Sequence, residues 1–159
     1  MKTILYIMCG LPYSGKTTYA KELASINHLE LVSIDDIREK YGFHWGDKEA
    51  NADEWKAIFK EVDDTIITSL RKGKSLIYDS TNHDRASRDR LRKLATSVGC
   101  ESKTIFMNTP MEIIMRRRTD NQKNPTRSHI PEHLFNVTLE SYEAPSSEEG
   151  EIIVIDKSE

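Results

Sequence analysis

Residues 10–18 read Gly-Leu-Pro-Tyr-Ser-Gly-Lys-Thr-Thr and follow the apolar, β-branched run of residues 4–8. They match the pattern G-x-x-x-x-G-K-[ST], and a helix-like stretch begins at Thr18, so the predicted order is strand, glycine turn and helix N-terminus. In this order the backbone N–H groups of the turn surround a polyphosphate, and the positive end of the helix dipole adds to the attraction. The stretch therefore predicts a binding site for a nucleoside triphosphate.

The motif assigns a role to each part of the loop. We expect contact with the nucleotide from Gly10, Leu11, Pro12, Tyr13, Ser14, Gly15, Lys16, Thr17 and Thr18. Gly10 and Gly15 permit positive φ angles and close approach of the backbone to phosphate. Lys16 is expected at the β- and γ-phosphates, and the Thr17 hydroxyl at Mg²⁺. ATP and Mg²⁺ are therefore the expected cofactors.

Strand and helix patterns alternate along the chain, which is typical of a parallel sheet covered by helices on both faces. The predicted strands are residues 4–9, 29–34, 75–78, 104–107 and 152–155. The predicted helices run to residue 26 and then over residues 36–41, 50–72, 86–98, 111–118 and 131–142, with Pro131 at position N1 of the last. The expected fold class is α/β: a three-layer P-loop NTPase fold with a mainly parallel five-stranded sheet and a small lid, in a single domain over residues 1–159.

The lid is expected over about residues 116–131. Within it, residues 120–129 are polar, contain Pro125 and show no helical periodicity, so they predict a mobile loop. Such a loop can close over bound phosphates and exclude water.

Composition and charge exclude several classes of protein. The chain is 37% hydrophobic and 31% charged, and no apolar run approaches the ~20 residues that cross a bilayer. The formal net charge of −3 gives no global positive field for nucleic acid. Two cysteines predict neither a disulfide framework nor a metal cluster, and Cys9 is expected to be a buried thiol. We expect a cytoplasmic protein without a signal peptide or membrane contact.

Acidic residues follow two predicted strands, where ligands of parallel sheets gather. Asp79 directly follows the strand at residues 75–78, the position of a carboxylate that holds Mg²⁺. Asp35 follows the second strand and can accept a proton from an attacking hydroxyl. Asp36 is expected to cap the next helix. Arg38, one turn beyond Asp35, is expected to hold an anionic group of the acceptor.

Eight of the ten arginines fall in two clusters after predicted strands: Arg85, Arg88, Arg90 and Arg92, and Arg116, Arg117, Arg118 and Arg127. Arginine is suited to bidentate contact with phosphate, although such residues also occupy solvated helix faces. Trp45, in the predicted loop over residues 42–47, is either a stacking platform for a base or part of the core.

Together these motifs resemble the polynucleotide 5′-kinase family. The resemblance rests on residues 10–18, on Asp-Asp-Ile-Arg at 35–38, on Asp-Ser-Thr-Asn at 79–82 and on an arginine-bearing loop before Pro131. It covers residues 2–145 in order and extends to other small P-loop kinases of the AAA_33 type, such as zeta-toxin kinases, chloramphenicol phosphotransferase and seryl-tRNA kinases.

The resemblance implies roles for further residues. It implies that Asp35 activates the 5′-hydroxyl, that Arg38 contacts the acceptor phosphate and that Arg127 stabilises the transferring phosphoryl group from the lid. It also places residues near the two substrates: Thr81, Asn82 and either Arg85 or Arg88 near the acceptor, and Arg116 and Arg118 near the nucleotide. Tyr13 stands where a smaller residue is common, so we expect it at the mouth of the acceptor site, either stacking on a base or shielding the site.

The expected activity is transfer of the γ-phosphate of ATP to a hydroxyl, with a polynucleotide 5′ end as the leading acceptor. A small-molecule kinase for an antibiotic, nucleoside or sugar would use the same Lys16, Asp35 and lid arginines. A nucleotide-dependent regulatory ATPase is the third possibility, but a simple switch does not need the pair of Asp35 and Arg38.

Overall fold

The computed structural model describes residues 2–43, 49–127 and 129–157. Its elements, in chain order, are β1 (Ile4–Cys9), α1 (Lys16–Asn27), β2 (Glu30–Ser33), α2 (Ile34–Lys40), α3 (Ala52–Arg71), β3 (Leu76–Asp79), α4 (Arg85–Ser97), β4 (Glu101–Asn108), α5 (Met111–Lys123), α6 (Glu132–Glu140), the 3₁₀ helix η1 (Ser147–Glu149) and β5 (Ile152–Asp156). In these described ranges, no helix combines the length and apolarity needed to cross a membrane.

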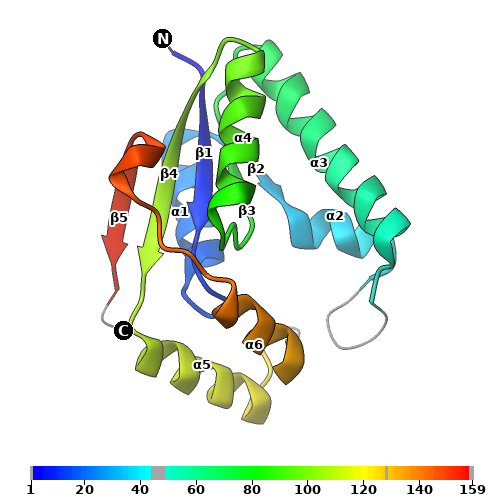
Figure 1. Cartoon of the computed structure of the whole chain (residues 1–159), viewed down its shortest axis with the longest axis vertical. Coiled ribbons are helices and arrows are strands. Elements are labelled where there is room, and N and C mark those ends of the chain that lie inside the picture. Colours follow the sequence, from blue (N-terminus) through cyan, green and yellow to red (C-terminus); the bar gives the residue numbers. More distant parts are fainter. Residues whose placement is uncertain (1, 44–48, 128, 158–159) are drawn as a thin grey trace.

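The five strands form one parallel sheet in the order β2-β3-β1-β4-β5. The central strand, β1, pairs with β3 on one side and with β4 on the other. Every connection between consecutive strands contains at least one helix, as parallel pairing requires. The sheet confirms the predicted α/β P-loop fold, and Figure 1 shows α5 and α6 lying beyond the carboxyl ends of the strands.

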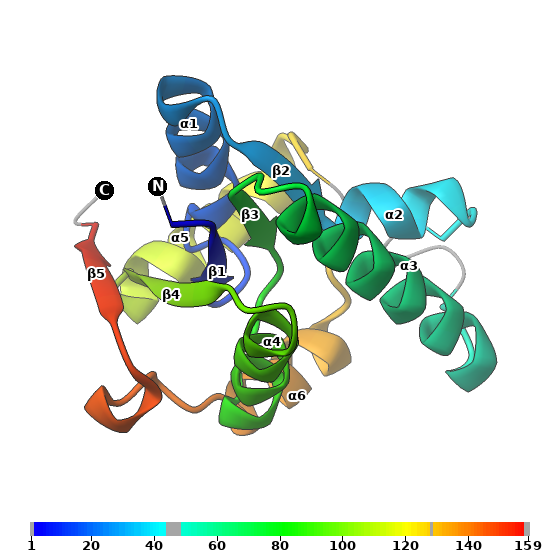
Figure 2. The ribbon, with the colours of Figure 1, turned by 90° about the horizontal axis from the view of Figure 1, so that it is seen from above.

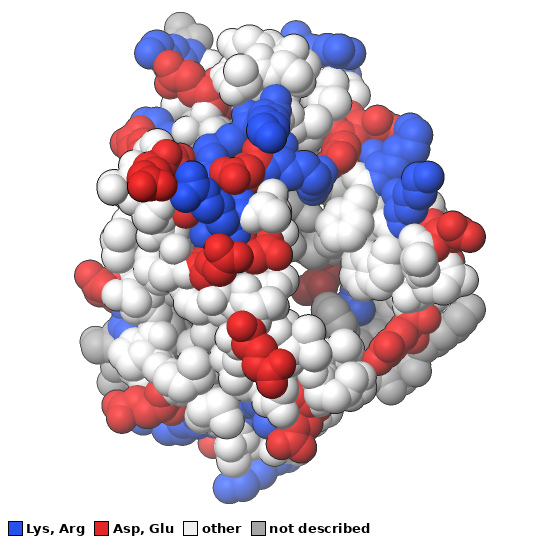
Figure 3. All heavy atoms as spheres, in the orientation of Figure 1, with Lys and Arg blue, Asp and Glu red and all other residues white. Residues whose placement is uncertain are grey.

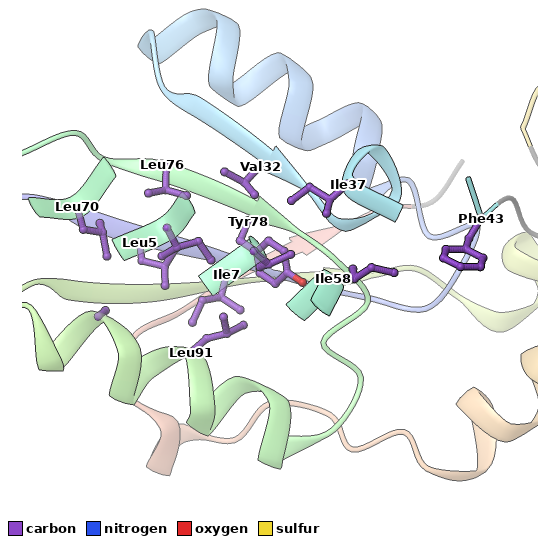
Figure 4. Close-up of a cluster of buried hydrophobic side chains, with 13 residues drawn as sticks. Leu5, Ile7, Val32, Ile37, Phe43, Ile58, Leu70, Leu76, Tyr78 and Leu91 are labelled. Carbon is purple, nitrogen blue, oxygen red and sulfur yellow. The ribbon is translucent and has the colours of Figure 1, made fainter. Parts of the chain in front are cut away.

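Two apolar cores cover the two faces of the sheet. On one face, Ile58 of α3 and Leu91 of α4 pack with Tyr78 of β3 in a single buried cluster (Figure 4). On the other face, Ala20 and Ala24 of α1 pack against the strands. Figure 2 shows α1 and α4 on opposite sides of the sheet. The cores hold the carboxyl ends of β1 and β3 side by side, which positions the site described below.

The longest helix, α3, follows the predicted pattern closely. Asn51 and Glu54 form a capping box at its start, where Asn51 Oδ1 accepts from the Glu54 N–H at 2.9 Å. Its buried residues recur at three- and four-residue steps: Ile58, Val62, Ile66, Ser69 and Leu70. Gly73, with φ of 75°, follows its end. This amphipathic face accounts for one wall of the core.

The predicted lid differs from the structure in its helical content. The α5 helix runs through Lys123, so the loop expected over residues 120–129 is partly helical. The final turn shows no apolar periodicity because its buried residue is the polar Asn121. A third apolar cluster of Leu11, Tyr13, Ile114, Ile130 and Phe135 joins α5 and α6 to the phosphate loop.

Two helix starts also differ from the prediction. The α2 helix begins at Ile34 with Ser33 as its N-cap, so Asp36 lies in the first turn and is not the cap. An acidic residue there still interacts favourably with the helix dipole. Pro131 is the N-cap of α6, where position N1 was expected. Because α2 begins at Ile34, Asp35 projects from the first turn of this helix and not from an extended strand end.

Candidate active site

Two glycines shape the loop between β1 and α1 for different reasons. Gly15, the N-cap of α1, has φ of 90°, a left-handed backbone that glycine adopts without strain. Gly10 does not have a positive φ, so the expectation of a positive φ is wrong for this residue. A Cβ at Gly10 would lie 2.6 Å from Ser14 Oγ, so this position requires glycine for space. The first turn of α1 has no side-chain cap, which leaves its N–H groups for an anion.

Thr17 and Asp79 meet at the start of α1. Thr17 Oγ1 donates to Asp79 Oδ2 at 2.7 Å, and the buried Asp79 Oδ1 has no hydrogen-bond partner among the described residues. The part of the chain that the structure describes contains no group of three or more His, Cys, Asp or Glu side chains that could hold a metal ion. A buried, unpartnered carboxylate oxygen beside a threonine hydroxyl suits Mg²⁺, which keeps water and substrate phosphates as its other ligands. The pair therefore fits the predicted metal site.

Lys16 is buried at the centre of the loop. Burial lowers the pKa of its ammonium group, and the negative charge of Asp79 opposes that change. A polyphosphate beside Lys16 would favour the charged form further, because an opposite charge at close range stabilises it.

Two cavities open beside the phosphate loop. The first, which we call the loop cavity, has a volume of about 1080 Å³ and is lined by the loop, α1 and the end of α5. The second, the helix cleft, has a volume of about 1010 Å³ and lies between α3, α4 and α6. Figure 3 shows this face of the molecule hollowed right of centre, with charged side chains at the base. Five residues line both cavities: Lys16, Thr17, Asp35, Arg38 and Arg127.

Asp35 and Arg38 form an ion pair at the junction of the two cavities. Arg38 Nη2 lies 3.4 Å from Asp35 Oδ1, and the side chain of Arg38 is 5% exposed whereas that of Asp35 is 44% exposed. Burial lowers the pKa of Arg38, and Asp35 opposes this shift. Because arginine stays protonated in proteins, the pair presents an accessible carboxylate held by a buried cation.

Tyr13 lies on the nucleotide side of the loop. It lines the loop cavity, and its ring is 5% exposed. The guanidinium carbon of Arg127 lies 4.7 Å from the ring centroid, and Phe135 meets the ring edge-on at 6.3 Å. The expectation that Tyr13 stands at the mouth of the acceptor site is therefore wrong, because α5 and α6 close over its ring.

The three consecutive arginines of α5 point in different directions. Arg117 Nη1 donates to the carbonyl of Tyr13 at 3.0 Å and lines the loop cavity, whereas Arg116 is exposed. Arg118 lies over the ring of Phe135 at 4.9 Å. Of the three arginines, Arg117 is therefore the one that lines the loop cavity, whereas Arg116 and Arg118 were the two expected near the nucleotide. The sequence does not distinguish them, because Arg117 and Arg118 each lie four residues after a buried isoleucine, Ile113 and Ile114.

The arginines of α4 are engaged with acidic side chains. Arg88 is fully buried and binds Glu149, with Nε 2.7 Å from Oε1 and Nη2 3.2 Å from Oε2. Arg85 pairs on the surface with Glu148 at 3.1 Å. The expectation that Arg85 or Arg88 contacts the acceptor is corrected for Arg88, because its side chain has no exposed surface. Figure 3 shows that the Lys and Arg side chains (blue) on the surface of α4 are interleaved with Asp and Glu side chains (red).

Thr81 and Asn82, which the resemblance placed near the acceptor, lie after β3 and line the helix cleft. They also hold the phosphate loop in place, since the Gly10 N–H donates to the Thr81 carbonyl at 3.0 Å and Asn82 Nδ2 to the Met8 carbonyl at 2.7 Å. Arg88 Nη1 donates to the Asn82 carbonyl at 2.9 Å. The buried Arg88–Glu149 pair therefore supports the loop that carries these residues, a role that sequence reasoning missed.

An aromatic wall lines the helix cleft and was also missed. Trp55 and Phe59, one turn apart on α3, are stacked with centroids 5.6 Å apart, and Phe59 is 39% exposed. The guanidinium of Arg90 lies 5.6 Å from the Phe59 ring and binds both oxygens of Asp63 at 2.6 and 2.7 Å. Trp45, the residue for which stacking was considered, lies outside the described residues.

The strand order, the phosphate loop and the two cavities that meet at Lys16 define a P-loop kinase-like, nucleotide-binding fold. A match to a protein-family model defines the class of protein more specifically than the fold does. The chain belongs to the AAA_33 family, described as an AAA domain, whose model matches residues 5–145. This match confirms the predicted family.

Solved structures of low sequence identity share the fold. A candidate kinase from Chloroflexus aurantiacus is 22% identical with a TM-score of 0.78, covering 98% of this chain and 89% of that one. A chain of the Pnkp1/Rnl/Hen1 RNA repair complex is 23% identical with a TM-score of 0.74, covering 88% and 44%. Kti12 from Chaetomium thermophilum, in complex with ADP-AlF3, is 18% identical with a TM-score of 0.71, covering 97% and 89%.

Two curated proteins are similar in sequence. Protein KTI12 of Saccharomyces cerevisiae is 28% identical over 152 residues, which is 90% of this chain and 47% of the relative. An adenylate kinase isoenzyme 6 homolog of Schizosaccharomyces pombe is 34% identical over 74 residues, which is 45% of this chain and 40% of the relative. The chain thus spans less than half the length of both.

Proposed function

We propose that the chain is an ATP-dependent phosphotransferase that transfers the γ-phosphate to a hydroxyl, with a polynucleotide 5′-hydroxyl end as its acceptor. The observation that carries this proposal is the sharing of Lys16, Thr17, Asp35, Arg38 and Arg127 by the two cavities. Nucleotide in the loop cavity and acceptor in the helix cleft would place the reacting groups together at these five residues. Proximity of this kind supplies a large part of catalysis in phosphoryl transfer.

Four of the five shared residues act on the reacting groups or the metal, and Arg38 holds the Asp35 carboxylate. The acceptor oxygen forms a bond to the γ-phosphorus as the bond from that phosphorus to the β–γ bridging oxygen breaks, and ADP leaves. The proton of the acceptor hydroxyl goes to Asp35. Lys16 and Arg127 stabilise the charge on the phosphoryl oxygens. Thr17 and Asp79 would hold Mg²⁺, which when bound would supply neutralisation of charge on the phosphates.

Two features support a nucleic-acid end as the acceptor. One is the resemblance of the motifs to polynucleotide 5′-kinases, together with the fold shared with a chain of the Pnkp1/Rnl/Hen1 RNA repair complex. The other is the wall of Trp55 and Phe59, since stacking on aromatic side chains is the usual way to hold an unpaired base.

A small-molecule acceptor is the second candidate, and the charges of the cleft favour it. Lys60 lies 2.5 Å from Asp64, and Arg90 binds Asp63, so these two cations of the cleft wall are already neutralised. A polymer that contacts several phosphates would meet little unbalanced positive charge on this wall. Its binding would also fall steeply with salt, whereas that of a neutral small acceptor would not.

Incubation with γ-labelled ATP tests these assignments. The wild-type protein and Lys16→Ala are supplied with 5′-hydroxyl DNA, 5′-hydroxyl RNA or a panel of nucleosides and sugars. Label on an oligonucleotide end supports the leading proposal, and label on a small molecule supports the second candidate. Label released only as inorganic phosphate, whatever acceptor is present, would contradict a kinase and indicate a regulatory ATPase.

A further inference from the structure

The backbone of Tyr13 is unusual for an aromatic residue. Its φ of 67° is in the left-handed region, which a bulky side chain occupies only when its surroundings compensate for the strain. Glycine would adopt the same backbone at no steric cost, as Gly15 does two residues later. The side chain of Tyr13 must therefore make contacts that a glycine at this position cannot make.

Those contacts come from the ring and not from the hydroxyl. Tyr13 Oη is buried and has no hydrogen-bond partner among the described residues. The ring lies under the guanidinium of Arg127 at 4.7 Å and against the edge of Phe135 at 6.3 Å. A cation over the face of an aromatic ring is attracted by the ring's quadrupole. The ring therefore contacts both Phe135 and Arg127, and Arg127 is the partner that carries a charge and lines both cavities.

Arg127 is held at both of its ends. Its backbone N–H donates to Asn121 Oδ1 at 3.2 Å, and its carbonyl accepts from Asn121 Nδ2 at 3.2 Å. Its guanidinium rests on Tyr13, whose own carbonyl accepts from Arg117 Nη1 at 3.0 Å. The end of α5 and the phosphate loop are therefore joined through Arg127, which lines both cavities.

We propose that Tyr13 is a positioning residue that presets the guanidinium of Arg127 at the junction of the two cavities. This inference rests on the proposed function, in which Arg127 acts on the transferring phosphoryl group. A long arginine side chain that is already oriented loses less conformational freedom when it meets the charge of the transition state. Tyr13 would then raise turnover through Arg127 while contributing little to the affinity for ATP.

Three substitutions at Tyr13 separate the ring from the backbone. In Tyr13→Leu the guanidinium loses its aromatic partner, and we expect kcat to fall about tenfold, the upper part of the range for such a contact. KM for ATP should stay within about twofold, because the phosphate contacts of the loop are unchanged. Tyr13→Phe keeps the ring and should retain nearly full kcat. Tyr13→Gly relaxes the backbone strain but also removes the ring, so it should lose turnover as Tyr13→Leu does.

A double-mutant cycle tests the coupling. Tyr13→Leu and Arg127→Met are combined, and ATP turnover is measured with and without the acceptor. If Tyr13 acts through Arg127, the double variant is no slower than Arg127→Met alone. Arg71→Met, at the exposed end of α3, is the matched control and should leave kcat unchanged.

Several results would overturn the proposal. These are additive effects in the cycle, a Tyr13→Phe variant as slow as Tyr13→Leu, or a Tyr13→Leu variant with a higher KM for ATP at unchanged kcat. Failure of the proposed function gives a different result, namely a wild-type protein that transfers label to no acceptor, whether or not it releases phosphate. In that case the same cycle is measured as the affinity for ADP with aluminium fluoride, and additive effects there would also reject the coupling.

Discussion

The loop cavity and the helix cleft have similar volumes, about 1080 and 1010 Å³, but they are built differently. The loop cavity takes much of its lining from one continuous stretch, residues 13–19, and adds polar residues from the end of α5. The helix cleft takes its lining from α2, α3, α4, α6 and the segment after β3. One side therefore reflects a local motif, and the other depends on how separate helices pack.

This difference bears on what each side recognises. Phosphates are bound by backbone N–H groups and by one lysine, which a short motif can supply with standard geometry. An acceptor is recognised by the shape and chemistry of a wall, and in the function that we propose this wall is the Trp55–Phe59 pair with the Arg90–Asp63 ion pair. We therefore expect substitutions on the two sides to have separable kinetic effects, with the shared residues affecting the chemical step.

The largest effect is expected at Asp35, where the two sides meet. Asp35→Asn keeps the size of the side chain but removes the proton acceptor, so transfer should fall by about 10²–10⁴-fold while ATP binding stays nearly intact. Steady-state rates with acceptor, together with ATP binding by calorimetry, check this. Asp36→Asn, one residue further along α2 and exposed, is the control and should behave as wild type. Equal losses in both variants would show that only the charge at the start of α2 matters.

Lys16→Ala should have the next largest effect and lower kcat/KM by roughly 10²-fold or more. The reason is that most of the catalysis of phosphoryl transfer is electrostatic. Turnover is measured over a range of ATP concentrations at saturating Mg²⁺. The control is Lys93→Ala, which removes an exposed lysine from α4. Wild-type turnover in Lys16→Ala would refute the assignment of the loop cavity to the nucleotide.

The support beneath the helix cleft should be sensitive to acid. Burial alone would raise the pKa of Glu149, but hydrogen bonds from Arg88 and the Ser146 N–H outweigh it and lower the pKa to about 2. Because the folded pKa lies below that of the unfolded chain, the stabilisation is complete above about pH 4.5 and is lost as the pH falls toward 2, amounting to about 3 kcal/mol. Urea unfolding at several pH values measures it.

Two variants show whether the loss of stability at low pH comes from Glu149. Glu149→Gln should be less stable at pH 7 and should lose most of this pH dependence, whereas Glu148→Gln, which removes a surface pair with Arg85, should keep the wild-type profile. An unchanged slope in Glu149→Gln would assign the acid sensitivity to other carboxylates.

The smallest effect is expected on the aromatic wall. Trp55→Ala should raise KM for a nucleic-acid or nucleoside acceptor about tenfold, with kcat and KM for ATP nearly unchanged, because stacking on a base contributes to binding and not to the chemistry. In a Trp45→Phe background, Trp55 is the sole tryptophan, so quenching of its fluorescence by adenosine but not by ribose reports stacking directly. Equal KM values for all acceptors in Trp55→Ala would remove the wall from the site.

Much of the fold and one side of the site could be predicted from local patterns. The order of strand, loop and helix around residues 10–18 is a contiguous arrangement, so its geometry follows from the backbone preferences of Gly15 and the space needed at Gly10. The alternation of strands and helices predicted the parallel sheet, because parallel strands need helical crossovers. The position of Asp79 at the end of β3 followed from the same rule.

Other features depend on contacts between residues far apart in the chain. Which of three consecutive arginines reaches the phosphate loop depends on how α5 is rotated against Tyr13, and only Arg117 faces it. The resemblance to polynucleotide 5′-kinases implied Arg85 or Arg88 near the acceptor, but Glu149, 61 residues away, holds Arg88 in the interior. The Trp55–Phe59 pair of α3 likewise becomes the wall of a cleft only because α4 and α6 also line it.

The sequence by itself determined the phosphate loop, the alternation of strands and helices and the position of Asp79 at the end of β3, because these depend on short-range backbone geometry. Tertiary structure alone decided which arginines reach the site, why an aromatic residue occupies a strained position at Tyr13, and what lines the acceptor side. The physical reason is that a cation, a ring or a carboxylate has a role only relative to its partner, and packing chooses partners across the whole chain.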